Sequence, residues 1–445
     1  MADNFFRVGT ANMYDSAMQN LSARQKSLVD LQENLTSGKR VVRPSDDPVA
    51  AAQAERAMTR IARIQAEQRQ LEIQKGNVTE AESTLGDAVG LVQEIRQAVV
   101  AAGGGTLTPA DRRTYAMQIQ SLQDQLKDVI NRKDVNGMPL LGSLGSALAP
   151  FVGPLPGAPD YLFSGLPGQD ASQGTAVASQ MDGHAALMFD PQRDGIYGAA
   201  VSNANPLYPL NGRQFNTSAV SVDHPEKIAP NTAPGGQPYT YRVVFGATTV
   251  NTDGSYSIAY QVTSTNPAFT AVNGTTATLT PDRTADIPIN FTDPGGANLS
   301  FDVKATPTRD SSGTVVLSPA PGDTVDISAT ASLMSSIDDA IAGIGSASNS
   351  SNANQYVGQA LSQIDAGLQR LQNVRSYAGE LLNRADRISG DQDNRSLQLE
   401  ADRSRAEDLD MVKGISDFQN ANVGYDAALK SYAQVQRLSL FNYIN

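Results

Sequence analysis

The fold is decided by residues 64–102, which read IQAEQRQLEIQKGNVTEAESTLGDAVGLVQEIRQAVVAA. Apolar side chains recur in this stretch at an interval of seven, at Ile64, Leu71, Val78, Leu85, Val92 and Val99. A second set follows three residues after the later members, at Ala81, Ala88, Ile95 and Ala102. This spacing predicts one long α-helix with a single apolar stripe, and the alanines predict closely packed neighbours. We interpret the stripe as the core of an intramolecular helical bundle.

Flanking residues mark where this long helix begins and ends. Ser45 is expected to cap its start, with two aspartates in the first turn and Pro48 close behind. The glycine run 103–105 is expected to end it, since glycine favours the turn that follows a helix. Thr108 and the proline after it then predict the start of a further helix.

Both ends of the chain carry seven-residue apolar patterns of their own. Near the start the members are Tyr14, Leu21, Leu28 and Leu35. Near the end the pattern steps by four and three through Met411, Ile415, Phe418, Asn422, Tyr425, Leu429 and Tyr432. Such spacing predicts two helices that pair with each other as a coiled coil. A bare two-helix arm is marginally stable, so we hypothesise that it orders when neighbouring subunits cover it, with the apolar members as an assembly interface.

The middle of the chain has a different composition. From about 138 to 330 the helical period disappears and Gly, Pro, Thr, Ser and Asn dominate. Short runs of β-prone residues alternate there with turn residues, which predicts an antiparallel sandwich or barrel. The runs are 239–245, 255–262, 277–279, 287–291, 299–303 and 314–317. The segment 140–235 is poorly periodic, and its structure is the least defined by the sequence.

The order of elements is therefore helix, helix, β, helix, helix. We predict an α+β multidomain protein with paired N- and C-terminal coiled-coil helices, a long-helix bundle and an inserted, mainly antiparallel β domain. The predicted domains are 1–41 with 403–445 for the coiled coil, 45–137 with 331–402 for the bundle, and 138–330 for the outer β domain. Because both connections to the β domain leave the bundle, no long unstructured linker is needed.

Composition excludes several classes of partner. The chain has 34 Lys+Arg and 46 Asp+Glu, a net charge of −12, which argues against nucleic acid. No stretch approaches the roughly 20 apolar residues of a membrane span, so membrane insertion is not expected. The first ten residues do not have the pattern of a signal peptide, which taken alone predicts a cytoplasmic protein.

A search for catalytic residues returns little. The chain has no cysteine and two histidines, His184 and His224, both within the loop-rich middle. No nucleophile elbow, phosphate-binding loop or metal-ligand spacing is present, and we expect surface histidines, no metal and no cofactor. The aspartates of 190–194 could hold Ca²⁺ weakly, but a solvated turn is favoured.

Several motifs resemble a known family. Residues 37–48 read SGKRVVRPSDDP and precede an alanine-rich stretch, which is similar to the signature of the bacterial flagellin superfamily. The motif YLFSG at 161–165 resembles the hook–filament junction proteins of that superfamily. Residues 406–411 (AEDLDM) and 438–445 (LSLFNYIN) are similar to the superfamily's C-terminal segment. The resemblance covers roughly 1–137 and 355–445.

This resemblance implies a structural role and no enzyme activity. A junction protein of this kind joins the hook of the bacterial flagellum to its filament and is secreted to the cell exterior. Export through the flagellar type III apparatus explains the missing signal peptide and replaces the cytoplasmic prediction. The implied partners are further copies of the chain in a ring, the neighbouring hook-associated protein on the hook side, flagellin on the filament side, and an export chaperone.

Two other classes stay open at this stage. A flagellin filament subunit shares the helical ends, and it would be favoured if the purified protein polymerised into long filaments. An enzyme would be favoured by a deep polar pocket around His184 or His224 with converging aspartates.

Overall fold

The computed structural model of the chain describes residues 10–145, 147–156, 160–169, 176–202, 205–208, 213–233, 236–347 and 349–441. Contacts between residues divide the chain into two compact units. One unit is formed by residues up to Leu71 and from Asp386 onward, and the other by Glu72–Ala385. Two long helices, α2 (Pro48–Ala102) and α7 (Ser350–Glu407), contribute to both units. Each unit is described separately below.

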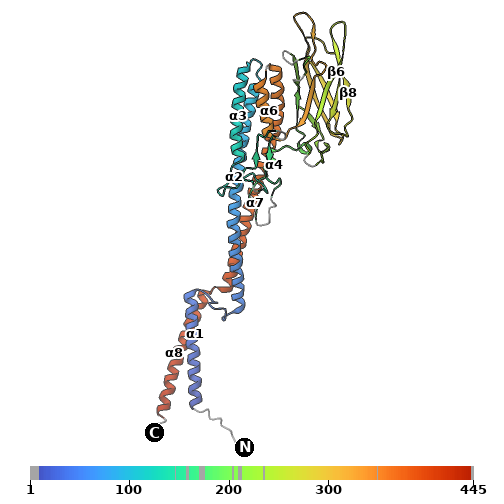
Figure 1. Cartoon of the computed structure of the whole chain (residues 1–445). Helices are drawn as coiled ribbons and strands as arrows, with labels where there is room; N and C mark the ends of the chain where they lie inside the picture. Colours follow the sequence, from blue (N-terminus) through green and yellow to red (C-terminus); the bar gives the residue numbers. More distant parts are fainter. Residues whose placement is uncertain are drawn as a thin grey trace. The chain divides into compact units, whose positions relative to one another are not determined.

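The first unit contains four helical segments. Helix α1 (Thr10–Ser37) pairs with α8 (Met411–Phe441), and Figure 1 shows the two side by side. The first turns of α2 pack against the last turns of α7, where Gln68 donates a hydrogen bond to Asp393 at 2.6 Å. Helix α2 begins two residues later than predicted: its cap is Asp47 rather than Ser45, because the Asp47 carboxylate accepts the backbone N–H of Ala50 at 3.0 Å.

The second unit has a helical core in which the seven-residue stripe of α2 is fully buried from Val78 onward. Val78, Leu85, Val92 and Val99 are inaccessible to solvent. They pack with α3 (Pro109–Ile130), α6 (Leu333–Ser346) and the first half of α7. Helix α3 begins at a capping box formed by Thr108 and Asp111, a stable arrangement for a helix start.

Segments 138–195 contribute to this helical core. Leu141, Tyr161 and Met181 are buried among the helices, which the prediction of a β domain from 138 to 330 does not include. Short elements connect them: β1 (Phe151–Val152), β2 (Leu162–Phe163), α4 (Gly183–Leu187) and α5 (Pro191–Asp194). The difference arises because isolated apolar residues among Gly and Pro carry no period, although they fill the bundle.

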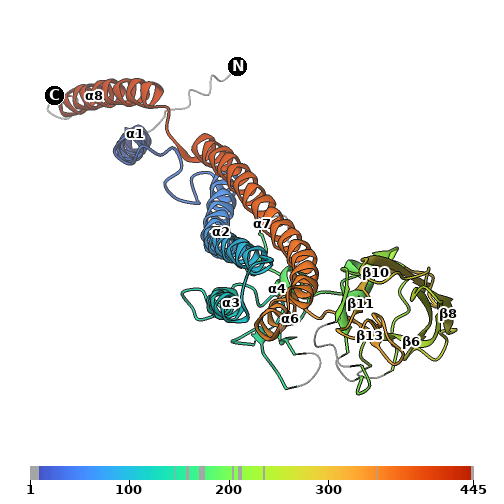
Figure 2. The same cartoon turned by 90° about the horizontal axis from the view of Figure 1, so that it is seen from above.

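The β domain of the second unit consists of two antiparallel sheets around one apolar core, and Figure 2 shows the sheets facing each other. One sheet has the order β3-β13-β6-β7-β8, and in the other β10 pairs with β4, β5 and β9. Alternation places Ile287, Ile289 and Phe291 of β9 inside. The strands are β3 (Tyr197–Val201), β4 (Gln214–Thr217), β5 (Ser221–Asp223), β6 (Tyr241–Val250), β7 (Tyr256–Ser264), β8 (Val272–Thr275), β9 (Ala285–Thr292), β10 (Asn298–Thr306) and β13 (Thr324–Ala329). A short 3₁₀ helix (Pro225–Lys227) and the hairpin of β11 (Thr308–Arg309) and β12 (Val315–Val316) complete the domain.

Three glutamines of α7 connect the β domain to the helical core. Gln355 donates to the Ala199 carbonyl at 3.0 Å, and Gln363 donates to Thr330 at 3.1 Å. Between them Gln359 donates to the Thr217 hydroxyl at 2.9 Å. All three side chains are buried, and their spacing of four places them along one face of the helix.

Candidate functional site

Helices α1 and α8 run antiparallel and approach each other closely at two glycines. A methyl group on Gly414 would lie 3.2 Å from Leu35, and one on Gly424 would lie 2.7 Å from the guanidinium of Arg24. Small residues at such positions let the two helix backbones come together, which larger side chains would prevent.

Six positions of α8 follow the seam with α1 in steps of four and three. They are Gly414, Phe418, Ala421, Tyr425, Ala428 and Tyr432, and each is at least half covered. Of the residues predicted from the sequence, Phe418, Tyr425 and Tyr432 therefore lie in the seam. On α1, Leu21, Leu28 and Leu35 are half-buried as well. Tyr14 belongs to α1, but its side chain lies outside the described residues.

The other predicted members of the α8 stripe lie beside the seam rather than in it. Met411 and Ile415 are each 46% exposed, and Leu429 is 38% exposed. Asn422 is exposed on the same side of α8. Ile415, Asn422 and Leu429 stand one position after Gly414, Ala421 and Ala428, so choosing large apolar residues misplaces these three members of the predicted stripe by one residue. The signal that would have found the seam is the seven-residue interval of the small residues themselves.

The chain segments that join α1 to α2 and α7 to α8 are bound to each other. The Leu409 N–H donates to the Gly38 carbonyl at 2.9 Å, and the Arg40 N–H donates to the Glu407 carbonyl at 2.8 Å. Lys39 forms an ion pair with Glu407. Gly38 has a φ of 70°, a left-handed conformation that suits glycine at the end of a helix. The SGKR part of the predicted signature thus holds the two connections together.

The SDDP part of the same motif orders the turn before α2. The Asp46 carboxylate accepts the Arg43 N–H at 2.8 Å, which closes the turn. Asp47 caps α2 and forms an ion pair with Arg40 at 3.2 Å. The hydrogen bond from the Ala50 N–H lowers the pKa of Asp47 below its usual value, and Arg40 contributes to the same effect. Two adjacent aspartates therefore have separate structural roles.

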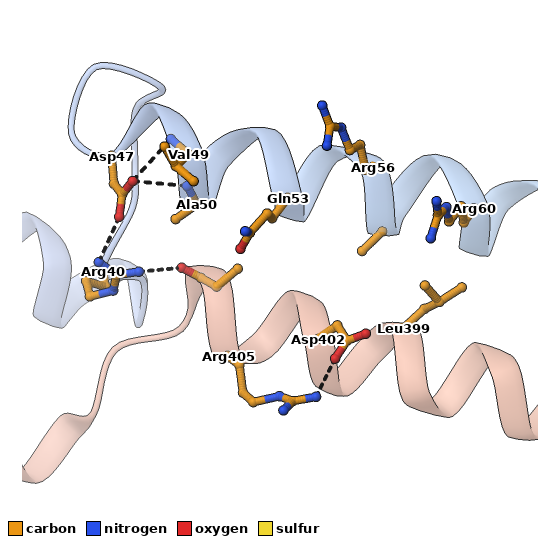
Figure 3. A pocket seen from close by; sticks show the side chains of 12 residues that line it. Arg40, Asp47, Val49, Ala50, Gln53, Arg56, Arg60, Leu399, Asp402 and Arg405 are labelled. Carbon is orange, nitrogen blue, oxygen red and sulfur yellow. Dashed lines mark hydrogen bonds and ion pairs between the residues drawn. The ribbon is translucent and has the colours of Figure 1, made fainter.

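A positively charged cleft of about 590 Å³ lies between the start of α2 and the end of α7. Figure 3 shows Arg40 between Asp47 and the Ala406 carbonyl, with Arg405 turned toward Asp402. Among the described residues, Arg56 and Arg60 have no hydrogen-bonding or ionic partner. The lining holds four arginines against two aspartates, so the cleft can bind carboxylates.

An apolar groove of about 490 Å³ lies on another side of the same turns of α2. We call it the α2 groove. It is lined by Val41, Val42, Arg43, Pro44, Pro48, Ala51, Ala52, Ala54, Glu55, Met58 and Glu407. Apolar side chains and proline rings form most of this lining. The groove can therefore receive an apolar side chain.

The two histidines lie in different surroundings. His184 is half-buried against Phe163, with ring centroids 5.7 Å apart, and burial lowers the pKa of its imidazole. His224 is exposed and lies 3.1 Å from Glu226. In the turn 190–194, the Asp194 carboxylate contacts Arg370 at 2.7 Å and Arg193 at 2.8 Å. Across the residues that the structure describes, no cluster of three or more His, Asp or Glu could hold a metal ion.

Comparison with known proteins identifies several relatives. Residues 8–144 match the bacterial flagellin N-terminal helical region. Flagellar hook-associated protein 3 of Salmonella typhimurium is 30% identical over 204 residues, which are 45% of this chain and 59% of that protein. Flagellin of Bacillus subtilis is 29% identical over 136 residues, which are 30% of this chain and 43% of that protein. The crystal structure of hook-associated protein 3 from Legionella pneumophila superimposes with a TM-score of 0.55 at 22% identity, covering 78% of this chain and 97% of that one.

These matches confirm the predicted resemblance and the predicted fold class. The matched relatives are named as flagellar components, and the match to hook-associated protein 3 of Salmonella typhimurium spans more residues than the match to flagellin of Bacillus subtilis. The match spans 59% of the length of that hook-associated protein, less than two thirds of it. Within the described residues, none of the helices is long and apolar enough to cross a membrane. The motif at 438–445 lies in part outside the described residues.

Proposed function

We propose that this chain, a relative of the flagellar hook-associated proteins with a flagellin-type N-terminal helical region, is a structural component that joins the hook of the bacterial flagellum to its filament. The observation that carries the proposal is the α1–α8 pair: a narrow seam between helices that leaves large apolar side chains uncovered beside it. Uncovered apolar residues of this kind mark a surface that another protein covers. A chain built for assembly needs no catalytic site, and we infer that it has no enzymatic role.

The predicted interface divides into two parts under this proposal. Leu21, Leu28, Leu35, Phe418, Tyr425 and Tyr432 hold α1 and α8 together. Met411, Ile415 and Leu429 face outward and contact neighbouring subunits in a ring. We place Tyr14 with the first group on its seven-residue spacing. The pair is disordered in the free subunit and orders on assembly, and hydrogen exchange tests this: strong protection of 10–36 and 410–435 in the monomer would contradict it.

The remaining partners follow from the same proposal. The chain contacts the neighbouring hook-associated protein on one side and flagellin on the other, and an export chaperone binds it before secretion. It is exported by the flagellar type III apparatus to the cell exterior. We retain the three-part division into a terminal coiled coil, a helical bundle and an outer β domain as the layers from the inside of the assembly outward.

Electron microscopy of a strain that lacks this chain tests the function. We expect hooks without filaments and flagellin released into the medium, with both restored by the intact gene. Filaments of normal length on such cells would overturn the proposal. The alternative, a filament-forming flagellin, would instead be supported if the purified chain alone polymerised into long filaments.

A further inference from the structure

Helix α8 begins with an exposed apolar projection next to an unpaired cation. Val412 is 82% exposed, and Met411 and Ile415 beside it are about half exposed. Lys413 is exposed, and among the described residues its ammonium has no carboxylate partner. We call Met411, Val412, Lys413 and Ile415 the α8 knob. An isolated subunit leaves this knob in water, which is unfavourable for the apolar part.

The α2 groove has complementary chemistry. Its lining includes the apolar side chains of Val42, Pro48 and Met58, and Met58 is itself 39% exposed. Glu55 is exposed on the groove, and no described cation pairs with its carboxylate. The groove thus offers an apolar slot with one free negative charge, and the knob offers apolar side chains with one free positive charge.

We propose that the α2 groove of one copy receives the α8 knob of a second copy, with Lys413 of the knob paired to Glu55 of the groove. This inference rests on the proposed assembly function and names the surfaces through which adjacent copies bind. Charge complementarity favours a second copy as the occupant, because the positive charge of Lys413 on the knob matches the negative charge of Glu55 on the groove. Knob and groove occur on the same chain, so every copy carries both surfaces. Within one copy the knob stays exposed, so it does not fill its own groove.

The geometry of such a contact has a consequence for assembly. Knob and groove are different patches of one surface, so their contact is heterologous, with each copy using its knob on one neighbour and its groove on the other. Repeating a heterologous contact produces a ring where the rotation closes and a helix where it does not. Either result places copies around a common axis, as the proposed junction requires.

Cross-linking tests the contact directly, because the chain contains no cysteine. We would co-express two tagged variants, Met58→Cys and Val412→Cys, in a strain lacking the native gene, and oxidise the sheared flagella. We expect a disulfide-linked dimer carrying both tags. Each variant expressed alone should give no dimer, and Val412→Cys with Val135→Cys, a 93% exposed site in the other unit, serves as the control pair. Absence of the mixed dimer in assembled flagella, or an equal yield from the control pair, would overturn the proposal.

A charge exchange tests the pairing of Glu55 with Lys413. Either Glu55→Lys or Lys413→Glu should lower the yield of the mixed dimer by about two- to fivefold, the range typical of an exposed ion pair. The double exchange should restore the yield, and equal loss in the double variant would overturn the pairing. Filament formation is scored in the same cells, which separates failure of the proposed contact from failure of the proposed function. Normal filaments without the mixed dimer would reject the knob–groove contact. Normal filaments in the deletion strain would reject the proposed junction function.

Discussion

Gly414 of α8 lies against Leu35 of α1, and a methyl group in place of its hydrogen would come within 3.2 Å of the leucine Cδ2. The same methyl group would lie 2.8 Å from the Cδ2 of Leu409. Two leucines from different segments therefore lie against this position, and a side chain placed there would have to push them aside. The glycine is a condition for the approach of the two helices, although glycine lowers the intrinsic stability of a helix.

Replacing Gly414 by valine should separate α1 from α8. Overpacking of a closed contact typically costs about 1–3 kcal/mol, which exceeds the gain in helix propensity. We expect faster hydrogen exchange along both helices in the assembled state and loss of filaments from the hooks. Gly390→Val is the matched control, since Gly390 lies in α7 with open space around it. Equal effects of both substitutions would show that helix propensity, rather than the seam, determines the result.

The seam also indicates what sequence reasoning can predict here. Large residues at seven-residue intervals identified α1, α2 and α8 and their amphipathic character, because burying a stripe requires that period. Three members of the predicted α8 stripe, Phe418, Tyr425 and Tyr432, lie in the seam. The positions between them were missed because Gly414, Ala421 and Ala428 are small and contribute little to a hydrophobic pattern. The cap of α2 was also missed, because serine and aspartate are both favoured at helix starts. Only the hydrogen bond from the Ala50 N–H to Asp47 shows that Asp47, and not Ser45, is the cap.

Removing two glutamines of α7 should loosen the β domain. In the variant Gln355→Leu with Gln359→Leu, the buried Ala199 carbonyl keeps the Thr217 hydroxyl at 3.3 Å as its side-chain donor. Each hydrogen bond lost from the two glutamines typically contributes about 0.5–1.5 kcal/mol to stability. We expect faster hydrogen exchange in β3 and β4 with little change in α2. Gln125→Leu is the control, because that exposed side chain bonds the carbonyl of its own helix at Ser121. Unchanged exchange in β3 would reject the role of these glutamines.

The buried pair of Arg213 and Asp323 should be sensitive to loss of one partner. Both side chains are almost fully buried, and Asp323 also accepts hydrogen bonds from Asn205 at 2.9 Å and from the Ala320 N–H at 2.7 Å. Asp323→Ala leaves a buried guanidinium without its carboxylate, so we expect a loss of about 3–5 kcal/mol in unfolding free energy by chemical denaturation.

The exposed pair of Arg242 and Asp326 supplies the comparison in the same domain. Asp326→Ala should change the unfolding free energy by less than about 1 kcal/mol, as exposed ion pairs do. The combined replacement Arg213→Met with Asp323→Leu should be less harmful than Asp323→Ala alone, because it leaves no buried charge. A double variant as unstable as the single one would mean that the neighbouring hydrogen bonds, and not the charge, dominate.

The antiparallel fold of the β domain could be predicted from the sequence, but the boundaries of the domain could not. Alternation in β9 and β10 is regular, and it identified both strands. The short strands β3, β4 and β5 lack that pattern, since their contacts with β13, β10 and α7 arise from distant parts of the chain. Similarly, Leu317 and Asp323, which bind Arg213, lie 104 and 110 residues away from it, beyond the reach of any local pattern.

Acid should weaken the start of α2 through Asp47. Its pKa lies below the usual value of 3.8, mainly because the Ala50 N–H binds the charged form, so folding favours the ionised carboxylate. The stabilisation from Asp47 is complete above the unfolded pKa and is lost as the pH falls through the lower folded pKa.

The variant Asp47→Asn keeps a capping oxygen but cannot ionise, and it loses the charge of the Arg40 pair. We therefore expect the variant to melt below the native chain at pH 6, with the gap narrowing as the pH is lowered from 4 toward 2, measured by circular dichroism. Asp30→Asn, at an exposed site of α1 without a described partner, should show no such convergence. A gap that stays constant across this range would mean that the charge of Asp47 does not contribute, and that its capping oxygen alone stabilises the helix.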